Sequence, residues 1–237
     1  ETYEIEIELM KNSFPTSIGT LTQDPQFSDV SNVLKILKKT IKIALSGLQN
    51  SNYPISFSEE SGVLKNYMNM LHNGSPEKSY VTSRDFIGFS SVSLEMPNIT
   101  PINPESDAAN IRNPYTVTEK ADGIRKLLYI NKDGKVYFID VNMNVQFTGV
   151  VAGNQDYHES ILDGEHVLHD KYGAFINYYL AFDAYYVGRE DIRSLALANG
   201  GGDETFDRTR IVEMHDIVTK ADFQPFIGER IPLTIKE

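Results

Sequence analysis

The sequence predicts an α+β protein, in which helices come first and a mostly antiparallel sheet follows. Apolar residues recur at helical spacing between Val30 and Leu48, which indicates an amphipathic helix. From residue 115 onward, the apolar residues fall instead in short runs rich in Ile, Val, Tyr and Phe that are separated by turn residues. Asn131-Lys-Asp-Gly lies between two of these runs and is typical of a hairpin turn, which joins antiparallel neighbours.

The helical part contains two segments. Ser28 or Asp29 can cap the first helix, and Lys35, Lys38, Lys39 and Lys42 lie largely outside its apolar stripe, as expected for a solvated face. A shorter helix is predicted from Glu59 to Leu71, because Asn73-Gly74 follows as a stop signal.

Residues 98–113 show no periodicity and are predicted to be a connector. After it the sequence predicts a series of strands, at Tyr115–Thr118, Ile124–Ile130, Val136–Asp140, Val145–Val151, Gly164–His169 and Phe175–Tyr186. A loop with three glycines follows at residues 199–203, and a helix is expected from Thr205 to Lys220.

Composition limits the possible functions. A chain of 237 residues can bury a sizeable core. It contains no cysteine, which excludes disulfides and thiolate metal sites. No apolar run is long enough to span a bilayer, so we expect no membrane partner. The net charge of −11 argues against a broad nucleic-acid surface, although local lysines could still bind the end of an RNA.

The most informative motif is Lys120-Ala-Asp-Gly-Ile-Arg. A lysine attacks phosphorus only as the free amine, so its site must suppress protonation or remove the proton. In an extended segment Lys120 and Asp122 point to the same face, Gly123 permits a tight turn or a close phosphate approach, and Arg125 offers planar donors. Taken alone, the pattern also describes an ordinary turn.

Two further motifs follow in order. Asp163-Gly-Glu165 comes after an apolar pair, and Asp183 lies inside the aromatic run Tyr178–Tyr186. With the lysine motif, these segments resemble the covalent nucleotidyltransferases, which include DNA ligases, RNA ligases and mRNA capping guanylyltransferases. The resemblance extends from about Phe86 to the end of the chain.

The resemblance implies specific roles. Lys120 is expected to be the catalytic nucleophile that forms a phosphoramidate with a nucleoside monophosphate. Nucleotide-binding roles are implied for Asp122, Gly123, Arg125, Glu165, Phe182 and Asp183. Among these, Arg125 would contact the sugar, Glu165 would lie near the ribose or a metal, and Phe182 would stack on guanine, with a packed core aromatic as its alternative.

The N-terminus contains a second pattern. Glu4, Glu6 and Glu8 alternate with apolar residues, so a strand would place the three carboxylates on one face. A solvated surface strand is the ordinary interpretation. The pattern also resembles the metal-binding glutamate strand of tunnel-fold RNA triphosphatases, where carboxylates hold Mg²⁺ or Mn²⁺.

Together these features resemble the mRNA capping enzymes of giant viruses, of the mimivirus type. The implied domains are the last triphosphatase strand (1–12), a helical connector (13–85) and a partial guanylyltransferase domain (86–237). The implied enzyme transfers GMP from GTP, through lysyl-GMP, to 5′-diphosphate RNA, and also removes the RNA γ-phosphate. Its partners would be GTP, the 5′ end of nascent RNA and the other domains of the same polypeptide, in the virion or host cytoplasm.

Two alternatives remain open: an ATP-dependent polynucleotide ligase, and an inactive nucleotidyltransferase-like binding module. The family has later strands with a Glu-Gly pair and a Lys-x-Lys motif, followed by an OB-fold domain, and the sequence ends at Glu237 without them. We therefore expect the chain to be a segment of a longer polypeptide.

Overall fold

The computed structural model describes residues 6–7, 30–72, 80–102, 105, 109–113, 115–199, 208–226 and 233–237. The chain forms two compact units, residues 1–54 and 55–237. The first contains helix α1 (Val30–Gln49), which confirms the predicted amphipathic helix. Lys35, Lys38, Lys39 and Lys42 are exposed on it, as expected.

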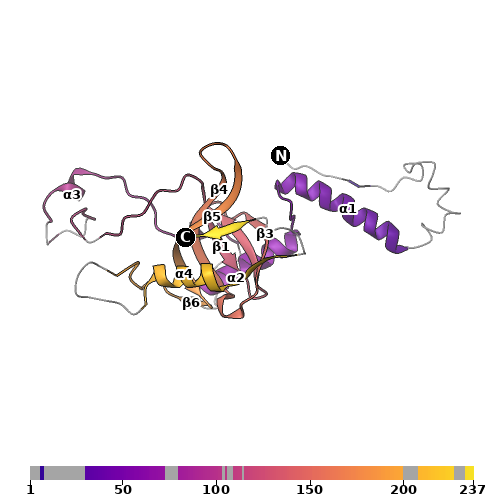
Figure 1. The fold of residues 1–237 in the computed structure, drawn as a ribbon. Coiled ribbons are helices and arrows are strands. Elements are labelled where there is room, and N and C mark those ends of the chain that lie inside the picture. The colour runs from indigo at the N-terminus through magenta and orange to yellow at the C-terminus, as the bar shows by residue number, and fades with distance from the viewer. Residues whose placement is uncertain are drawn as a thin grey trace. The chain divides into compact units, whose positions relative to one another are not determined.

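The second unit is built on a curled, mostly antiparallel sheet (Figure 1). The described residues form eight strands, in the order β6-β5-β4-β1-β2-β3-β7, with β8 parallel to β5. Their bounds are β1 Ile124–Ile130, β2 Lys135–Asp140, β3 Val145–Ala152, β4 Ser160–His169, β5 Phe175–Val187, β6 Glu190–Asp191, β7 Phe223–Pro225 and β8 Thr234–Lys236. The Asn131–Gly134 turn joins β1 to its antiparallel partner β2, as predicted.

Helix α4 (Arg210–Lys220) packs on one face of this sheet, where Met214 and Ile217 join the core formed by Leu128 and Leu162. We call this the α4 face. Because side chains alternate along strands, Arg125 and Asp163 lie on the opposite face, the Arg125 face. The two faces are thus chemically different, one being the main apolar core and the other carrying buried charges.

Helix α2 (Phe57–Leu71) is attached to the sheet by Glu59, which accepts hydrogen bonds from Lys135 Nζ (2.8 Å) and Tyr137 Oη (2.7 Å). From the same helix, the fully buried Tyr67 holds the segment that leads toward the sheet. Its hydroxyl donates to the Asp85 carbonyl (2.8 Å) and accepts from the Ile87 amide (3.1 Å). Residues 85–87, which begin at the last residue of the 3₁₀ turn Ser83–Asp85, are therefore fixed by α2.

Three predicted boundaries were wrong for identifiable reasons. Helix α2 begins at Phe57, because the Ser56 hydroxyl caps it by accepting from the Glu59 amide (3.1 Å). Helix α4 begins only at Arg210, where Thr209 is the N-cap. Strand β4 begins at Ser160, four residues before the predicted start, since the residues preceding Gly164 pair with β1.

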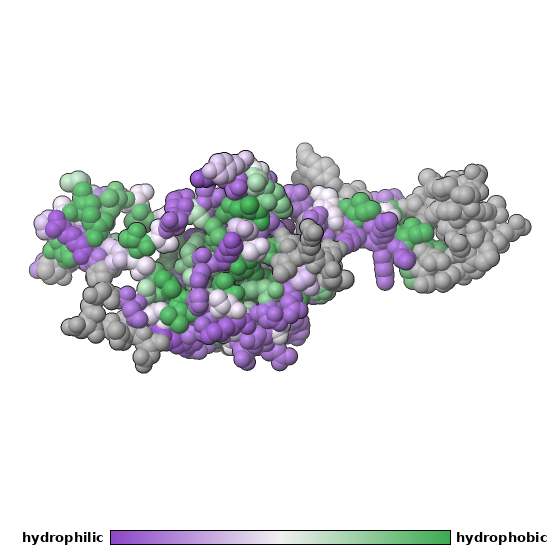
Figure 2. All heavy atoms as spheres, in the orientation of Figure 1, coloured by the Kyte–Doolittle hydropathy of each residue, from purple (hydrophilic) through white to green (hydrophobic). Residues whose placement is uncertain are grey.

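Residues 115–118, predicted as a strand, pair with no neighbouring strand in the described structure and are exposed. The described residues among 80–123 are instead largely irregular, apart from the 3₁₀ turn and the short helix α3 (Met96–Ile99). Hydrophobic side chains gather on the surface around α3 (Figure 2), including Val92, Leu94, Met96 and Ile102. This stretch thus buries little of its own apolar surface. In the described part of the chain, every helix is too short or too polar to cross a bilayer.

Candidate active site

A pocket of about 530 Å³ brings together three of the residues predicted from the motifs. Lys120 comes from the irregular segment before β1, Glu165 from β4 and Phe182 from β5. Its other lining residues are Thr118, Glu119, Ala121, Leu180, Ala181 and Glu237. A cation, three carboxylates and an aromatic ring therefore surround one cavity, which we call the Lys120 pocket.

Gly123 explains how the lysine segment reaches this position. A side chain there would place its Cβ 2.7 Å from the His166 carbonyl oxygen and 2.9 Å from Val167 Cγ2. Glycine thus lets the chain approach β4 closely. At this contact the Gly123 amide donates to Glu165 Oε2 (2.7 Å), so Glu165 joins the lysine motif to the wall of the pocket.

Lys120 and Asp122 are both exposed. The Lys120 amine is 3.4 Å from the Ala121 carbonyl oxygen, its one hydrogen-bond partner among the described residues, which leaves the amine accessible to a phosphate in the pocket. Asp122 forms no hydrogen bond or ion pair with the described residues and does not line the pocket.

Arg125 lies on the same face but outside the lining of the pocket. Its Nε donates to Asp163 Oδ1 (3.1 Å), its Nη2 to Asp163 Oδ2 (2.5 Å) and its Nη1 to the Phe89 carbonyl (2.9 Å). Hydrogen bonds with Asp163 raise the pKa of the Arg125 guanidinium. Each nitrogen of Arg125 therefore already has a protein partner.

Asp163 is a functional candidate that the residue-level predictions omitted. It is fully buried, and it accepts from Tyr185 Oη (2.6 Å) in addition to Arg125. Burial raises the pKa of Tyr185, and the negative charge of the nearby Asp163 carboxylate is the second cause. The phenol therefore stays protonated and acts as a donor. The usable signal in the sequence was the two-residue spacing of Asp163 and Glu165, which places both on one face of a strand.

Phe182 occupies an irregular position on β5. Gly164 pairs with Ala181, whereas its neighbour Asp163 pairs with Asp183, so Phe182 is an extra residue without a partner on β4. Such a β-bulge bends a strand and redirects a side chain, and bulges are common beside active sites. Phe182 lines the Lys120 pocket and is 37% exposed, which leaves its ring available for stacking.

Asp183 lies outside the Lys120 pocket lining and is 5% exposed. Both of its oxygens accept from Arg210 of α4, at 2.8 Å from Nε and 3.1 Å from Nη2. Burial raises the pKa of Asp183 even though Arg210 opposes this shift. In this structure Asp183 attaches α4 to β5.

The N-terminal glutamates fall mostly outside the described residues. Glu4 and Glu8 are not described, and Glu6 is exposed and not part of a strand. Among the described residues, no group of three or more His, Asp or Glu side chains could hold a metal ion. Glu165 contacts the lysine motif through the Gly123 amide. Mg²⁺ sites often combine one or two carboxylates with substrate phosphates.

Comparison of the sequence with known proteins identifies relatives of this chain. The sequence model of the family described as "mRNA capping enzyme, catalytic domain" matches residues 52–223, which include α2, most of the sheet and all the residues of the Lys120 pocket except Glu237. A "Probable mRNA-capping enzyme" of Acanthamoeba polyphaga mimivirus is 25% identical over 191 residues. That alignment covers 81% of this chain but only 13% of the mimivirus protein. Because the family model spans most of the chain, the chain belongs to the mRNA capping enzyme catalytic-domain family.

Proposed function

We propose that this domain is an mRNA guanylyltransferase that transfers GMP from GTP to a 5′-diphosphate RNA end through a lysyl-GMP intermediate. The single observation that carries the proposal is the Lys120 pocket, in which an accessible lysine faces a carboxylate and an exposed aromatic ring. Membership of the capping-enzyme family and the similarity to a viral capping enzyme support it.

The chemistry has two balanced steps. In the first, the neutral amine of Lys120 attacks the α-phosphorus of GTP, a P–N bond forms, the bond to the bridging oxygen breaks and pyrophosphate leaves. In the second, a terminal β-phosphate oxygen of the RNA attacks the same phosphorus, and the P–N bond breaks to release the lysine. The exposure of Lys120 allows both reactants to reach it from solvent.

The other pocket residues would position the nucleotide. Phe182 offers a face for stacking on guanine, and Glu165 has a second oxygen, Oε1, that can accept from the ribose or coordinate a cation. Mg²⁺ or Mn²⁺, when bound, would offset charge on the phosphates. Arg125 would reach the sugar only by exchanging one of its contacts with Asp163 or Phe89.

A covalent-labelling experiment tests this function. Full-length protein containing this chain is incubated with GTP or ATP labelled at the α-phosphate and analysed on a denaturing gel. We expect label from GTP, and none in Lys120→Ala or in Lys120→Arg, since arginine does not supply a neutral amine at working pH. Lys132→Ala, at another exposed lysine of the same unit, is the control that should retain the label.

The other outcomes identify the alternatives. Label from ATP alone would indicate a polynucleotide ligase, and no label from either nucleotide would indicate an inactive binding module. Label that persists in Lys120→Arg would refute Lys120 as the nucleophile.

We also propose that Glu4, Glu6 and Glu8 belong to an RNA triphosphatase in the same polypeptide, which prepares the diphosphate end. The one-sided alternation of these three glutamates supports this assignment. Replacing Glu4 and Glu6 with alanine should abolish release of the RNA γ-phosphate and spare the lysyl-GMP label. Equal loss of both activities would contradict it.

A further inference from the structure

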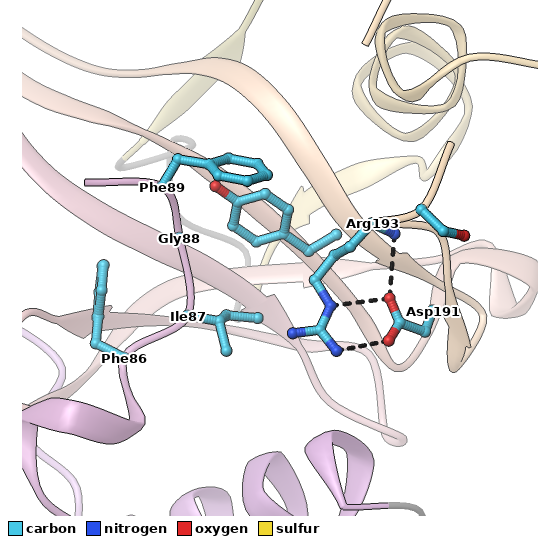
Figure 3. A pocket seen from close by; sticks show the side chains of 8 residues that line it. Phe86, Ile87, Gly88, Phe89, Asp191 and Arg193 are labelled. Carbon is cyan, nitrogen blue, oxygen red and sulfur yellow. Dashed lines mark hydrogen bonds and ion pairs between the residues drawn. The ribbon is translucent and has the colours of Figure 1, made fainter. Parts of the chain in front are cut away.

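A second, larger pocket of about 700 Å³ lies in the same unit and is not used by the proposed transfer to Lys120 (Figure 3). Residues 86–89 form one wall, with Phe89 in edge contact with Tyr185 of β5 at 6.3 Å between ring centroids. Asp191, Arg193 and Ser194 lie at the other side. We call this cavity the Phe89 pocket. Its aromatic walls suit a flat, apolar ring.

The polar side of the Phe89 pocket is electrically balanced. Arg193 donates from Nε (2.9 Å) and Nη2 (2.6 Å) to the two oxygens of Asp191, and these hydrogen bonds lower the pKa of Asp191. Among the described residues Nη1 of Arg193 has no hydrogen-bond partner, and Figure 3 shows the third guanidinium nitrogen directed away from Asp191. The pocket therefore offers a free donor without a strong net charge, which fits the edge of a neutral heterocycle better than a phosphate.

The two pockets are close to each other. Phe182 lines the Lys120 pocket, and Tyr185 lines the Phe89 pocket. The two residues are three positions apart on β5, which corresponds to about 10 Å along a strand. Between them lies Arg125, which pairs in register with Glu165 of the Lys120 pocket and donates to the Phe89 carbonyl. A ligand that has its phosphates at Lys120 could thus place an attached ring in the Phe89 pocket.

We propose that the Phe89 pocket binds the base of the 5′-terminal nucleotide of the acceptor RNA, an inference that rests on the guanylyltransferase function proposed above. Unpaired RNA bases are commonly held by stacking on aromatic side chains, and such stacking tolerates any base. The net charge of −11 disfavours long contacts with the RNA backbone, so an acceptor held mainly by its terminal base suits this chain.

Separating the two half-reactions tests the proposal. Phe89 is 64% exposed, so Phe89→Ala should fold, and it keeps the carbonyl that Arg125 uses. Ser194→Trp should instead fill the pocket. We expect both variants to form lysyl-GMP from GTP at the normal rate and to show about a tenfold higher KM for 5′-diphosphate RNA, from the usual range of base-stacking effects. Tyr172→Ala, at another exposed aromatic residue, is the control with unchanged KM.

The acceptor RNA can also be modified, so that the same contact is removed from the side of the ligand. An RNA whose first nucleotide lacks its base should raise the KM of the wild-type protein by the same factor and should leave that of Phe89→Ala unchanged. If Phe89→Ala and wild-type proteins respond equally to the loss of the base, or if neither variant alters the KM, the Phe89 pocket does not bind that base. Absence of lysyl-GMP in the wild-type protein would instead refute the guanylyltransferase function and this proposal with it.

Discussion

Asp163 and Asp183 lie directly opposite each other on the neighbouring strands β4 and β5, and each buried carboxylate is held by a different arginine. Arg125, from β1, binds Asp163, and Arg210, from the first turn of α4, binds Asp183. Two acids beside each other in a buried setting would repel strongly if either arginine were lost. The pairs therefore couple the position of Arg125 beside the candidate site to the docking of α4.

We predict that Asp183→Asn lowers the free energy of unfolding by about 3–5 kcal/mol, because it leaves the guanidinium of Arg210 buried without its charge partner. Denaturant unfolding followed by circular dichroism measures this. Asp191→Asn is the matched control at the more exposed Asp191–Arg193 pair, with an expected loss within about 1 kcal/mol. Equal losses in the two variants would mean that burial does not govern the Arg210 contact.

Gly123→Ala should destabilise the protein by about 1–3 kcal/mol, since its methyl group would meet the His166 carbonyl at 2.7 Å. It should also reduce lysyl-GMP formation, because the strain moves the Lys120 segment relative to Glu165. The control is Gly62→Ala in the middle of α2, where nothing lies within 4 Å of the new Cβ. That change should instead stabilise by about 0.5–1 kcal/mol. A thermal shift assay and the labelling gel compare the two, and a neutral Gly123→Ala would count against the close approach.

Removing the ring in Phe182→Ala should weaken GTP binding about tenfold, from the usual worth of stacking a base on an aromatic side chain. Its effect on stability should be small, because the ring is 37% exposed. Phe175→Ala, at a more exposed phenylalanine on the same strand outside the Lys120 pocket, should leave GTP affinity unchanged. Fluorescence titration with a labelled GTP analogue gives both values. Equal affinities of Phe182→Ala and the wild type would assign Phe182 to packing.

The attachment of α2 should depend on pH. Burial alone would raise the pKa of Glu59, but hydrogen bonds from Lys135 and Tyr137 outweigh it and lower the pKa below its ordinary value of 4.5. Glu59 therefore stabilises the folded state above pH 4.5, and this contribution is lost as the pH falls through the lower, folded-state pKa. In Glu59→Gln the free energy of unfolding should be smaller at neutral pH and should fall less steeply below pH 4.5. Parallel curves for mutant and wild type would contradict the predicted shift.

Three motifs in a recognisable order predict that Lys120, Glu165 and Phe182 belong to one site. The structure places these three residues around one pocket, and their roles there stay predictions. The sequence did not predict where Asp183 points. Regular alternation would put Asp183 on the same face as Ala181, and the extra residue at Phe182 reverses that. A bulge changes the register of one strand against another, so it depends on pairing across the sheet, which local residue patterns do not contain.

The contacts of Arg125 were equally inaccessible from sequence. Its partner Asp163 is 38 residues away, and the Phe89 carbonyl that it also binds is 36 residues away on an irregular segment. Neither contact has a periodic signal. By contrast, helix α1 and the β1–β2 hairpin follow from residues within a few positions of each other, and these two predictions were confirmed.

The Tyr67 hydroxyl has a practical consequence for anyone who wishes to produce this domain. The Tyr67 hydroxyl binds the backbone of both Asp85 and Ile87. The wall of the Phe89 pocket that carries Phe86 and Phe89 is therefore positioned by α2, whose residues line neither pocket. An expression fragment that begins at Tyr115 would retain all three motifs of the Lys120 site and yet lose that wall. The shortest useful fragment should therefore start upstream of Phe57, and Tyr67→Phe should reveal whether the wall still holds its place when the hydroxyl alone is removed.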